Sequence, residues 1–475
     1  MKRTGNIIDR YLVGLLSCFL VATGCGDDST KGQESNNSGD KSSEKGDQTI
    51  AELSVHCPGE VNEKKDIYYC VVPAGEYTID QAEDEEQLHW TEDLIYVLDG
   101  KVFIGDDNEE TVLTIDPGTL ILGETVTDLD NSAALIIQRS SKVMAEGTPE
   151  KPIVFTSAKE IGKRANDDWG GVVINGKAPI NRCNGETNCS AAGEGDTGRY
   201  GGNDPDDDSG VLNYVRIEFS GKRLDPTKEF NGLSLQGVGR GTDIHHIQIH
   251  RAGDDTIEFF GGTAEVHHIL LSGTGDDSFD WTDGWSGKAQ FVIAIGADGL
   301  ASDCAIEADN LELDFDTSPR SNPTLYNFSL LTGGEMLFRR GTAGTFVNFA
   351  TYSELCLDVA DISTWEQIEA DNLTITHSVV DHDNCFRNDD LEHIGNLESD
   401  WWAAGENNRI ISDFGLVDPF AEKGAAPDFR LKDDSPLWDE AGAPPEGDDF
   451  FETVEFIGAM GADDWTEGWT DYPEN

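Results

Sequence analysis

The chain has 475 residues, with 92 acidic side chains against 33 basic ones and a formal net charge of −59. Residues 1–24 hold three basic residues and one acidic residue, so the remainder has 30 basic and 91 acidic residues and a net charge of −61. Such a surface repels nucleic acid and anionic lipid headgroups, and we expect neither as a direct partner. The acidic residues either solvate the surface or, in part, bind calcium.

The N-terminus has the order of a bacterial export signal. Basic residues precede an apolar run over residues 11–22, which is followed by small residues and Cys25. The run is too short for a permanent transmembrane helix, so residues 1–24 are predicted to be a cleaved signal peptide. The sequence Ala-Thr-Gly-Cys at 22–25 resembles the lipobox of bacterial lipoproteins, in which the cysteine is acylated on its thiol and becomes the first residue.

This resemblance implies lipidation at Cys25 and an exported protein that is anchored to the bacterial cell envelope, at the outer membrane or the cell surface. The alternative is an ordinary secretory signal in which Cys25 has no such role. Residues 25–50 are then the lipidated cysteine and a disordered tether, because residues 26–49 contain no large apolar side chain. A flexible coil of about 25 residues spans roughly 28 Å on average. No later stretch approaches the ~20 apolar residues of a transmembrane helix, so we expect the rest to be soluble.

Two segments that depart from the repeat described below are predicted to cap the folded part, residues 51–92 and residues 421–475. Caps are expected because exposed terminal strands invite aggregation. An exported protein can also form disulfides. Two pairs of cysteines close small loops and are disulfide candidates: Cys57 with Cys70, and Cys183 with Cys189. Three further cysteines leave one odd thiol, and their pairing stays open: Cys304, Cys356 and Cys385.

The middle of the chain contains a repeat of 22 residues. Gly241 to Gly262 reads GTDIHHIQIHRAGDDTIEFFGG, and Thr263 to Gly284 reads TAEVHHILLSGTGDDSFDWTDG. Alternating apolar residues separated by Gly and Asp predict short strands and turns with no room for a helix. One such unit cannot close on itself, but a coil of units pairs each strand with the next at about 4.8 Å. The sequence therefore predicts an all-β fold, a right-handed parallel β-helix (solenoid) over residues 93–420.

Short apolar runs bounded by Gly, Pro, Asn or Asp continue this rhythm on both sides of the repeat. Three insertions between them are long enough to protrude as loops, at residues 181–208, 222–230 and 301–320. In a solenoid such insertions gather on one face, which is the usual binding face.

Two segments resemble a known family: Glu146 to Ser157 (EGTPEKPIVFTS) and Trp169 to Ile180 (WGGVVINGKAPI). Both are similar to motifs of secreted bacterial β-helix proteins of the pectin-lyase-like superfold, many of them surface proteins without an assigned function. The resemblance covers roughly residues 95–350. It implies the fold and export, and it leaves the activity open because one fold hosts many functions.

Stacking of the two 22-residue units predicts a ladder of carboxylates. The members of each pair are expected about 5 Å apart: Asp254 and Asp276, Asp255 and Asp277, Glu258 and Asp280. Carboxylates at this distance repel, and a divalent cation would remove the conflict, which makes Asp255 and Asp277 candidate calcium ligands. The alternative is that each Asp caps a turn by accepting backbone N–H bonds while water and salt screen the charge.

A second acidic loop also has calcium-like spacing. Asp204, Asp206 and Asp208 occupy positions 1, 3 and 5, as in a loop that wraps oxygen ligands around calcium. Its glycine, Gly210, comes one place later than in an EF-hand loop, and position 12 is Val215 in place of a bidentate Glu. The alternative is an acidic, solvated loop.

Enzymes of the same superfold imply two catalytic hypotheses. Polygalacturonase-type hydrolases use aspartates on neighbouring coils as general acid and base, and the two Asp-Asp turns resemble that arrangement (Asp254, Asp255, Asp276 and Asp277). The Gly-His-Gly and Arg-Ile-Lys segments of those enzymes do not follow, and carboxylates one coil apart are closer than the ~6.5–9.5 Å of an inverting mechanism. Calcium-dependent polysaccharide lyases need an Arg or Lys base near the metal, for which the chain offers Arg251 or Arg216.

Histidines and tryptophans beside the ladder are further candidates. The pairs His245-His246 and His267-His268 suit a transition metal, but neighbours in a strand point to opposite sides, so at most one stacked pair is expected to chelate and satisfied histidines are the alternative. Trp281 has the inward phase of a core residue. Trp285 is freer in the sequence pattern and is the candidate for binding sugars.

These observations lead to one main hypothesis and two alternatives. The main one is a cell-surface β-helix without catalysis that binds an extended ligand, a polysaccharide, with calcium at its acidic turns. The alternatives are a polysaccharide lyase or glycoside hydrolase that uses the Asp ladder, and a structural or adhesion protein of the envelope. No organic cofactor is indicated, because the chain has no nucleophile-elbow, Walker or HExxH pattern.

Overall fold

The computed structural model describes residues 49–474 except 66, 79–87, 126–130, 183–188, 226–227, 298–299, 301, 389–394, 396 and 422–424. The predicted signal peptide, Cys25 and nearly all of the predicted tether lie outside these residues. In the part that the structure describes, no helix is long and apolar enough to span a membrane.

The N-terminal end of the stack is closed by an antiparallel strand. Helix α2 (Ile50–Leu53) and the 3₁₀ turn η2 (Ser54–His56) lead into β1 (Glu60–Lys64), which pairs antiparallel with β2 (Ile67–Tyr77). The predicted disulfide between Cys57 and Cys70 is confirmed. Because β1 occupies the outer edge of β2, it protects the first parallel strand from pairing with another chain.

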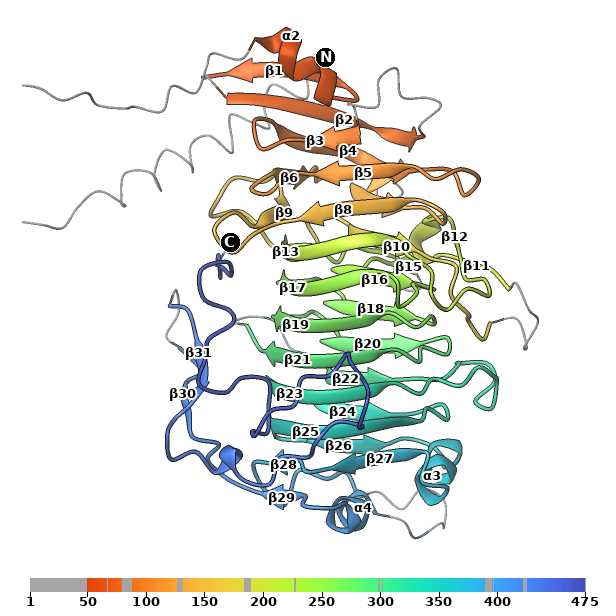
Figure 1. Cartoon of the computed structure of the whole chain (residues 1–475), viewed down its shortest axis with the longest axis vertical. Coiled ribbons are helices and arrows are strands. Elements are labelled where there is room, and N and C mark those ends of the chain that lie inside the picture. The colour runs from red at the N-terminus through yellow and green to blue at the C-terminus, as the bar shows by residue number, and fades with distance from the viewer. Residues whose placement is uncertain are drawn as a thin grey trace, which may run out of the picture.

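The predicted right-handed parallel β-helix is confirmed, with strands stacked along the long axis of the molecule (Figure 1). Each coil gives one strand to each of three columns. The first column contains the second half of β4 (Ile95–Ile104), then β7 (Ala134–Ile137), β10 (Gly171–Asn175), β16 (Leu233–Gln236), β18 (Ile257–Phe260), β20 (Phe279–Thr282), β22 (Cys304–Ala308), β24 (Glu335–Phe338) and β26 (Leu357–Val359).

The other two columns share six long strands that bend at a corner of the coil: β13 (Gly210–Glu218), β17 (Asp243–His250), β19 (Glu265–Ser272), β21 (Lys288–Ile295), β23 (Thr324–Gly333) and β25 (Gly344–Ser353). Their first halves continue β3 (His89–Trp90), β5 (Val112–Ile115) and β8 (Lys142–Glu146), and end on β27 (Leu373–Thr376). Their second halves continue β2, β4, β6 (Leu120–Gly123) and β9 (Ile153–Ser157), and end on β28 (Val379–Val380) and β29 (Arg409–Ile410).

The corner of these strands is a stacked row of residues in the left-handed region, with φ between 47° and 65°: Tyr214, His246, His268, Phe291, Asn327, Asn348 and, between β27 and β28, His377. A left-handed residue turns the chain sharply and interrupts the in-and-out alternation of a strand. Asn is typical there, whereas His, Tyr and Phe are unusual.

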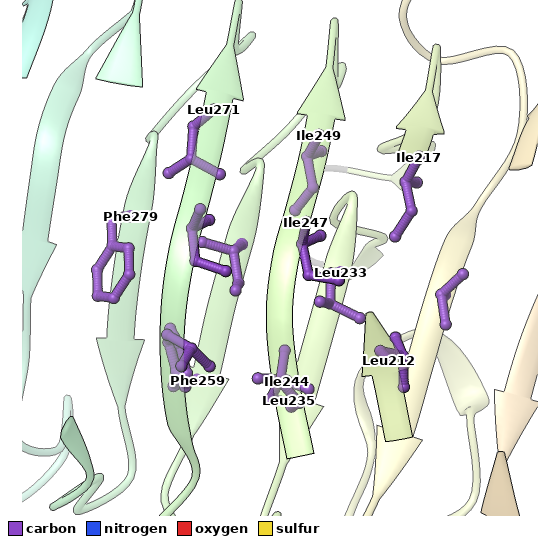
Figure 2. Close-up of a cluster of buried hydrophobic side chains, with 14 of the residues drawn as sticks. Leu212, Ile217, Leu233, Leu235, Ile244, Ile247, Ile249, Phe259, Leu271 and Phe279 are labelled. Atoms are coloured by element: carbon purple, nitrogen blue, oxygen red, sulfur yellow. The ribbon is translucent and has the colours of Figure 1, made fainter. Parts of the chain in front are cut away.

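The interior is a continuous apolar stack. Register pairs Ile217 with Ile249 and Ile249 with Leu271, and these three lie side by side on neighbouring strands (Figure 2). Ile257 pairs with Phe279 in the same way. The 22-residue offset is confirmed, since His245 pairs with His267 and Phe259 with Trp281. Burial of these side chains is the main stabilising contribution, at about 25 cal/mol per Å² of apolar surface.

The remaining elements lie in inserted loops or near the C-terminal end of the solenoid. Two small antiparallel hairpins lie in the predicted insertions, β11 (Ala191–Ala192) with β12 (Arg199–Tyr200) and β14 (Arg223–Asp225) with β15 (Lys228–Glu229), and η5 (Glu194–Asp196) lies in the first. Helices α3 (Ile362–Glu369) and α4 (Glu398–Ala404) lie at the C-terminal end, near the last coils (Figure 1). They are followed by β30 (Leu416–Asp418), β31 (Asp428–Leu431) and η6 (Pro436–Trp438).

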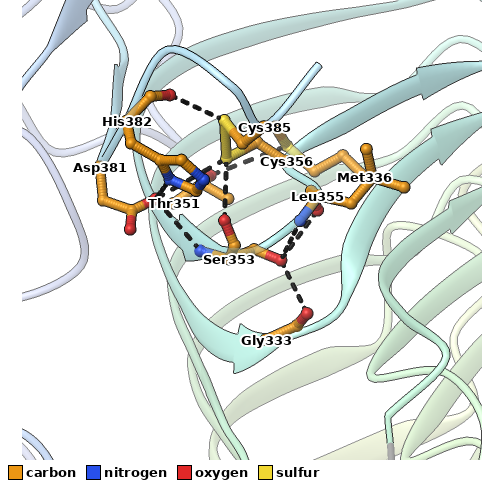
Figure 3. The surroundings of a disulfide bond; sticks show 9 residues. All are labelled: Gly333, Met336, Thr351, Ser353, Leu355, Cys356, Asp381, His382 and Cys385. Carbon is orange, nitrogen blue, oxygen red and sulfur yellow. Dashed lines mark hydrogen bonds and ion pairs between the residues drawn. A yellow bond between two sulfur atoms is a disulfide. The ribbon is translucent and has the colours of Figure 1, made fainter. Parts of the chain in front are cut away.

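A disulfide joins Cys356 to Cys385 across neighbouring coils, with Asp381 and His382 beside it (Figure 3). Cys304 is buried and is the free thiol among the described residues. Cys189 is disulfide-bonded, and its predicted partner Cys183 lies outside the described residues.

The C-terminal segment, residues 439–474, runs back along the side of the stack toward its N-terminal half (Figure 1). Side chains of several coils form hydrogen bonds with its backbone: Asn348 with Gly442, Gln290 with Glu452, and Gln248 with Asp471. Trp465 and Trp469 therefore lie against the middle of the solenoid, beside His246, and do not lie over the last coil.

Candidate functional site

An acidic cavity of about 690 Å³ opens on the first strand column. Three parts of the chain form it: the two Asp-Asp turns, the outward side chains of β18, β20 and β22, and loops from all three predicted insertions. Its acidic lining residues are Glu194, Glu229, Asp254, Asp255, Glu258, Asp276, Asp277, Asp280, Glu307, Asp309, Glu312 and Asp314. Arg182 and Arg340 also line it. The expectation that the insertions gather on one face is confirmed.

Strand register explains why the carboxylates converge. Glu258, Asp280 and Glu307 are in direct register on β18, β20 and β22, so their side chains form one column. They alternate with the inward Ile257, Phe259 and their partners, which pack in the core. Parallel pairing at about 4.8 Å then forces acidic groups of successive coils together.

Two of the predicted turn aspartates accept backbone hydrogen bonds from the next coil. Asp255 Oδ1 accepts from the N–H of Asp277 at 2.9 Å, and Asp277 Oδ1 accepts from the N–H of Cys304 at 2.7 Å. Both residues thus accept backbone hydrogen bonds, as the turn-capping alternative expects, although the donors belong to the next coil. This leaves the second carboxylate oxygen of each available for another interaction.

Other carboxylates have no such partner. Asp254 is 4% exposed and Asp280 is 7% exposed, yet the Oδ1 atom of each is buried without a hydrogen-bond donor. Nearby Glu258 accepts one hydrogen bond, from the Asn231 amide at 2.5 Å. A buried polar atom without a partner costs about 1–3 kcal/mol, and more when it is charged.

Burial and mutual repulsion raise the pKa values of this cluster. Desolvation raises the pKa of Asp254 to about 8, with repulsion from Glu229 and Asp276 adding to it. Desolvation also raises the pKa of Asp277 to about 7. For Asp280, desolvation and then the neighbouring Glu258 raise the pKa well above its ordinary range.

Three groups of possible metal ligands lie at this cavity, and the first two share Asp255: Asp255, Glu258 and Asp280; Asp254, Asp255 and Asp276; Asp277, Cys304 and Glu307. Within each group the ligand atoms are within 4.8 Å of one another. The first two groups offer only carboxylate oxygens, the donors that Ca²⁺ prefers. Cys304 is a poor ligand in the third, because burial raises the pKa of its thiol.

Basic side chains neutralise the edges of the cavity. Arg339 pairs with Glu307 and, at 2.8 Å, with Asp309, and Arg340 pairs with Asp309 at 2.5 Å. Among the described residues, no basic side chain forms an ion pair with Asp255, Asp280 or the Glu258 that lies between them. The negative charge is therefore concentrated at the centre of the cavity.

The other predicted calcium ligands lie elsewhere. Asp206 pairs with Arg240 at 2.6 Å, Asp208 pairs with Lys142 at 2.6 Å, and Asp204 accepts a hydrogen bond from the N–H of Asp206 at 3.1 Å. None of the ligand groups found among the described residues includes them. This loop follows the acidic, solvated alternative in the part that the structure describes.

The candidate bases also lie outside the cavity. Arg251 lines a different hollow with His250 and Tyr472, and Arg216 pairs with Glu218 at 3.1 Å. The strand halves that carry them belong to another column of the coil. The basic groups at the acidic cavity are instead Arg182 and Arg340, which come from inserted loops and a later coil.

The prediction that Trp285 binds sugars needs correction. Its side chain is fully buried, and its ring stacks on Phe259 at 4.1 Å while its indole N–H donates to the Ala264 carbonyl at 3.2 Å. The chain turns inward after β20, so both Trp285 and Trp281 belong to the core. The expectation for Trp281 is confirmed.

The expected orientation of the histidine pairs is also wrong. His246 and His268 are the left-handed corner residues, so the two histidines of each pair lie together on the outside. Their Nδ1 atoms are 2.8 Å apart in both pairs. Only the Asn residues at this corner, Asn327 and Asn348, gave a sequence signal for a left-handed conformation.

Sequence patterns missed several acidic residues of the cavity. Glu307 follows Asp280 by 27 residues because a loop interrupts the 22-residue spacing, although both sit between apolar neighbours in a short strand. Glu194 and Glu229 come from the small hairpin insertions, for which the sequence predicted only protruding loops.

Comparison with known proteins adds one match. The family model described as the pectate-lyase-like beta helix domain matches residues 82–405, which is well over half of the chain. No curated protein and no solved structure matches the chain.

Proposed function

The chain belongs to the pectate-lyase-like β-helix domain family, and from this premise we propose that its acidic cavity binds Ca²⁺ and, through it, an extended polysaccharide. We further propose that the protein is exported and anchored through a lipid on Cys25. The single observation that carries the binding proposal is Asp280: its Oδ1 atom is buried without a hydrogen-bond donor, and its carboxylate lies within 4.8 Å of those of Asp255 and Glu258.

A cation resolves the energetic conflict of this cluster. Several ionised carboxylates in a desolvated cavity repel, and a few protons or one divalent ion are the two ways to relieve the repulsion. Asp255, Glu258 and Asp280 would hold the ion, and Asp254 and Asp276 border a second position next to it. Ca²⁺ takes six to eight oxygen ligands. One oxygen each of Asp255 and Glu258 already accepts a hydrogen bond, so the three carboxylates would leave positions for ligand oxygens or water.

The cavity suits a polar, extended ligand. It is open to solvent and has inserted loops as walls, while Phe260, Leu311 and Leu313 are its apolar contacts. No tryptophan lines it in the described part of the chain, so recognition would rest on cation and hydrogen-bond contacts. A bound Ca²⁺ would supply positive charge for the carboxylates or hydroxyls of a sugar chain.

Calorimetric titration of the metal-free protein with Ca²⁺ tests the first step. We expect stoichiometric binding to the wild type and a loss of at least about tenfold in affinity for Asp280→Asn. Asp206→Asn is the matched control, because it removes a carboxylate from the other acidic loop, and its affinity should equal that of the wild type. Loss of binding in Asp206→Asn but not in Asp280→Asn would place the site in that loop and contradict the proposal.

The second step is tested on a glycan array with polygalacturonate and neutral polysaccharides, in Ca²⁺ and in EDTA. Retention that requires Ca²⁺ and is lost in Asp280→Asn supports the proposal. An array without any bound glycan would leave the structural or adhesion alternative. Metabolic labelling with a fatty acid tests the anchor, and Cys25→Ser should abolish the label.

A catalytic function is the second candidate, and one observation favours it. The pKa values of about 8 for Asp254 and about 7 for Asp277 lie near those of groups that act as general acids at neutral pH. Release of unsaturated or reducing ends from a bound polysaccharide would reveal a lyase or a hydrolase. The double variant Asp255→Ala/Asp277→Ala should abolish that release, and unchanged release would exclude the Asp ladder as its source.

A further inference from the structure

Four histidines meet at the corner of the solenoid, on the side away from the acidic cavity's strand column. His245 and His246 come from β17, and His267 and His268 come from the next coil, in β19. The left-handed backbone at His246 and His268 places both members of each pair on the outside. Their Nδ1 atoms approach to 2.8 Å in each pair, and neither pair is bonded to a carboxylate at that atom.

The two pairs stack in register. The His246 and His268 rings lie 4.5 Å apart at an interplanar angle of 5°, and the His245 and His267 rings lie 5.0 Å apart at 11°. One ring nitrogen each from His246, His267 and His268 lies within 4.8 Å of the others. Metal–nitrogen bonds of ~2.0–2.1 Å in a tetrahedral site place the nitrogens about 3.3 Å apart. An imidazole binds a metal in its ring plane, so the stacked rings have to rotate out of their parallel arrangement to converge on one ion.

We propose that this cluster binds one borderline transition-metal ion, Zn²⁺ or Cu²⁺, through His246, His267 and His268, with His245 as the fourth donor. Neutral imidazole nitrogens suit these ions, whereas Ca²⁺ and Mg²⁺ prefer oxygen. The site is therefore chemically separate from the acidic cavity.

Aromatic side chains surround the cluster. Tyr214 stacks on His246 at 4.5 Å, and Trp465 of the C-terminal segment meets His268 edge-on at 5.2 Å. Trp469 lies 5.9 Å from His246. An apolar rim excludes water and strengthens coordination, and it places two tryptophans where a bound Cu²⁺ would quench their fluorescence.

The competing explanation is that each pair is joined by an Nδ1–H···Nδ1 hydrogen bond and that the rings only stack. The experiment separates the two. Metal-free protein, with Ca²⁺ added to saturate the acidic cavity, is titrated with Zn²⁺ by calorimetry and with Cu²⁺ by electron paramagnetic resonance. We expect one equivalent bound, nitrogen hyperfine splitting from at least three imidazoles, and quenched tryptophan fluorescence.

The variants His246→Asn and His268→Asn are suited to this corner, because Asn327 and Asn348 already occupy equivalent left-handed positions. Each should weaken Zn²⁺ binding at least about tenfold, since each removes one of the four imidazole donors. His89→Gln, which removes a histidine paired with Asp116, and Asp280→Asn in the acidic cavity are the controls and should bind Zn²⁺ as the wild type does.

Stoichiometric binding that persists in a His246→Asn/His268→Asn double variant would overturn the proposal, as would the absence of any bound equivalent. If the double variant loses its β-sheet circular dichroism, the hyperfine pattern of the wild type decides: splitting from fewer than three nitrogens contradicts the site. His382→Gln probes the other histidine-containing cluster, beside the Cys356–Cys385 disulfide. Loss of Zn²⁺ binding in that variant would move the site there.

Discussion

At the scale of single residues, two atypical environments define this protein: buried carboxylates without partners and histidines with a left-handed backbone. Asp280 is in the first environment: its Oδ1 atom is buried without a hydrogen-bond donor beside Glu258, which costs folding free energy. A group that costs folding free energy in this way is retained where a ligand compensates for it. The histidines keep a backbone conformation that disfavours their side chains, at a cost on the order of 1 kcal/mol each.

The Asp280 penalty makes a testable prediction. In EDTA at slightly alkaline pH, Asp280→Asn should raise the free energy of unfolding by about 1–3 kcal/mol, because a neutral amide replaces a carboxyl group that repels its neighbours. In saturating Ca²⁺ the order should reverse, because only the wild type gains the binding energy. Urea unfolding measures both, with Asp206→Asn as the control. A destabilised Asp280→Asn in EDTA would show that the carboxyl group is satisfied.

At the scale of elements, the C-terminal segment is held by carboxamides that project from several coils of the solenoid. Gln248 and Gln290 are 0% and 1% exposed, and each both accepts from and donates to the backbone of one residue of the segment. Such paired bonds substitute for the strand partner that an irregular segment lacks. The segment in turn covers the outer face of β17 to β25, including the histidine corner.

Removing one of these side chains should loosen the segment locally. For Gln248→Ala or Gln290→Ala we expect about 1–3 kcal/mol of destabilisation, because two part-buried backbone groups lose their partner. Hydrogen exchange should rise over residues 448–474 in both variants. The matched control is Gln367→Ala, since Gln367 is also buried but bonds Ser363 within α3, and it should leave those amides protected. Unchanged exchange in Gln248→Ala and Gln290→Ala would show that apolar packing alone holds the segment.

At the scale of the whole molecule, charge and solenoid architecture act on stability in opposite directions. Parallel stacking buries one continuous core, but it also aligns acidic side chains, in a chain whose net charge from residue 25 onward is −61. The cavity carboxyls bind protons more tightly in the folded chain than in the unfolded one. Their contribution to folding stability is therefore greatest at acidic pH and is lost as the pH rises from about 4 toward about 8.

The histidines affect the pH dependence of folding stability in the opposite direction. Their pKa values are lowered, so their contribution is complete above the unfolded value of about 6.5 and is lost as the pH falls below it. Between about pH 6.5 and about pH 8.5 we therefore expect the melting temperature in EDTA to fall, and millimolar Ca²⁺ to abolish this fall. Differential scanning calorimetry measures it. A melting temperature that is independent of pH in EDTA would contradict the raised carboxyl pKa values.

The sequence by itself determined the solenoid and part of the site. The 22-residue repeat predicts which side chains stack, because parallel pairing repeats one register from coil to coil, and it placed Asp255 near Asp277 and Glu258 near Asp280. Tertiary structure alone decided where the loops bring Glu194 and Glu229, that Trp285 points into the core, and that the C-terminal segment follows the side of the stack. Sequence periodicity shows which side of a regular strand each side chain faces. The direction of the chain after a left-handed residue or in a long loop depends instead on the residues that pack against that segment. For that reason the histidines point outward together, against the alternation expected from their sequence.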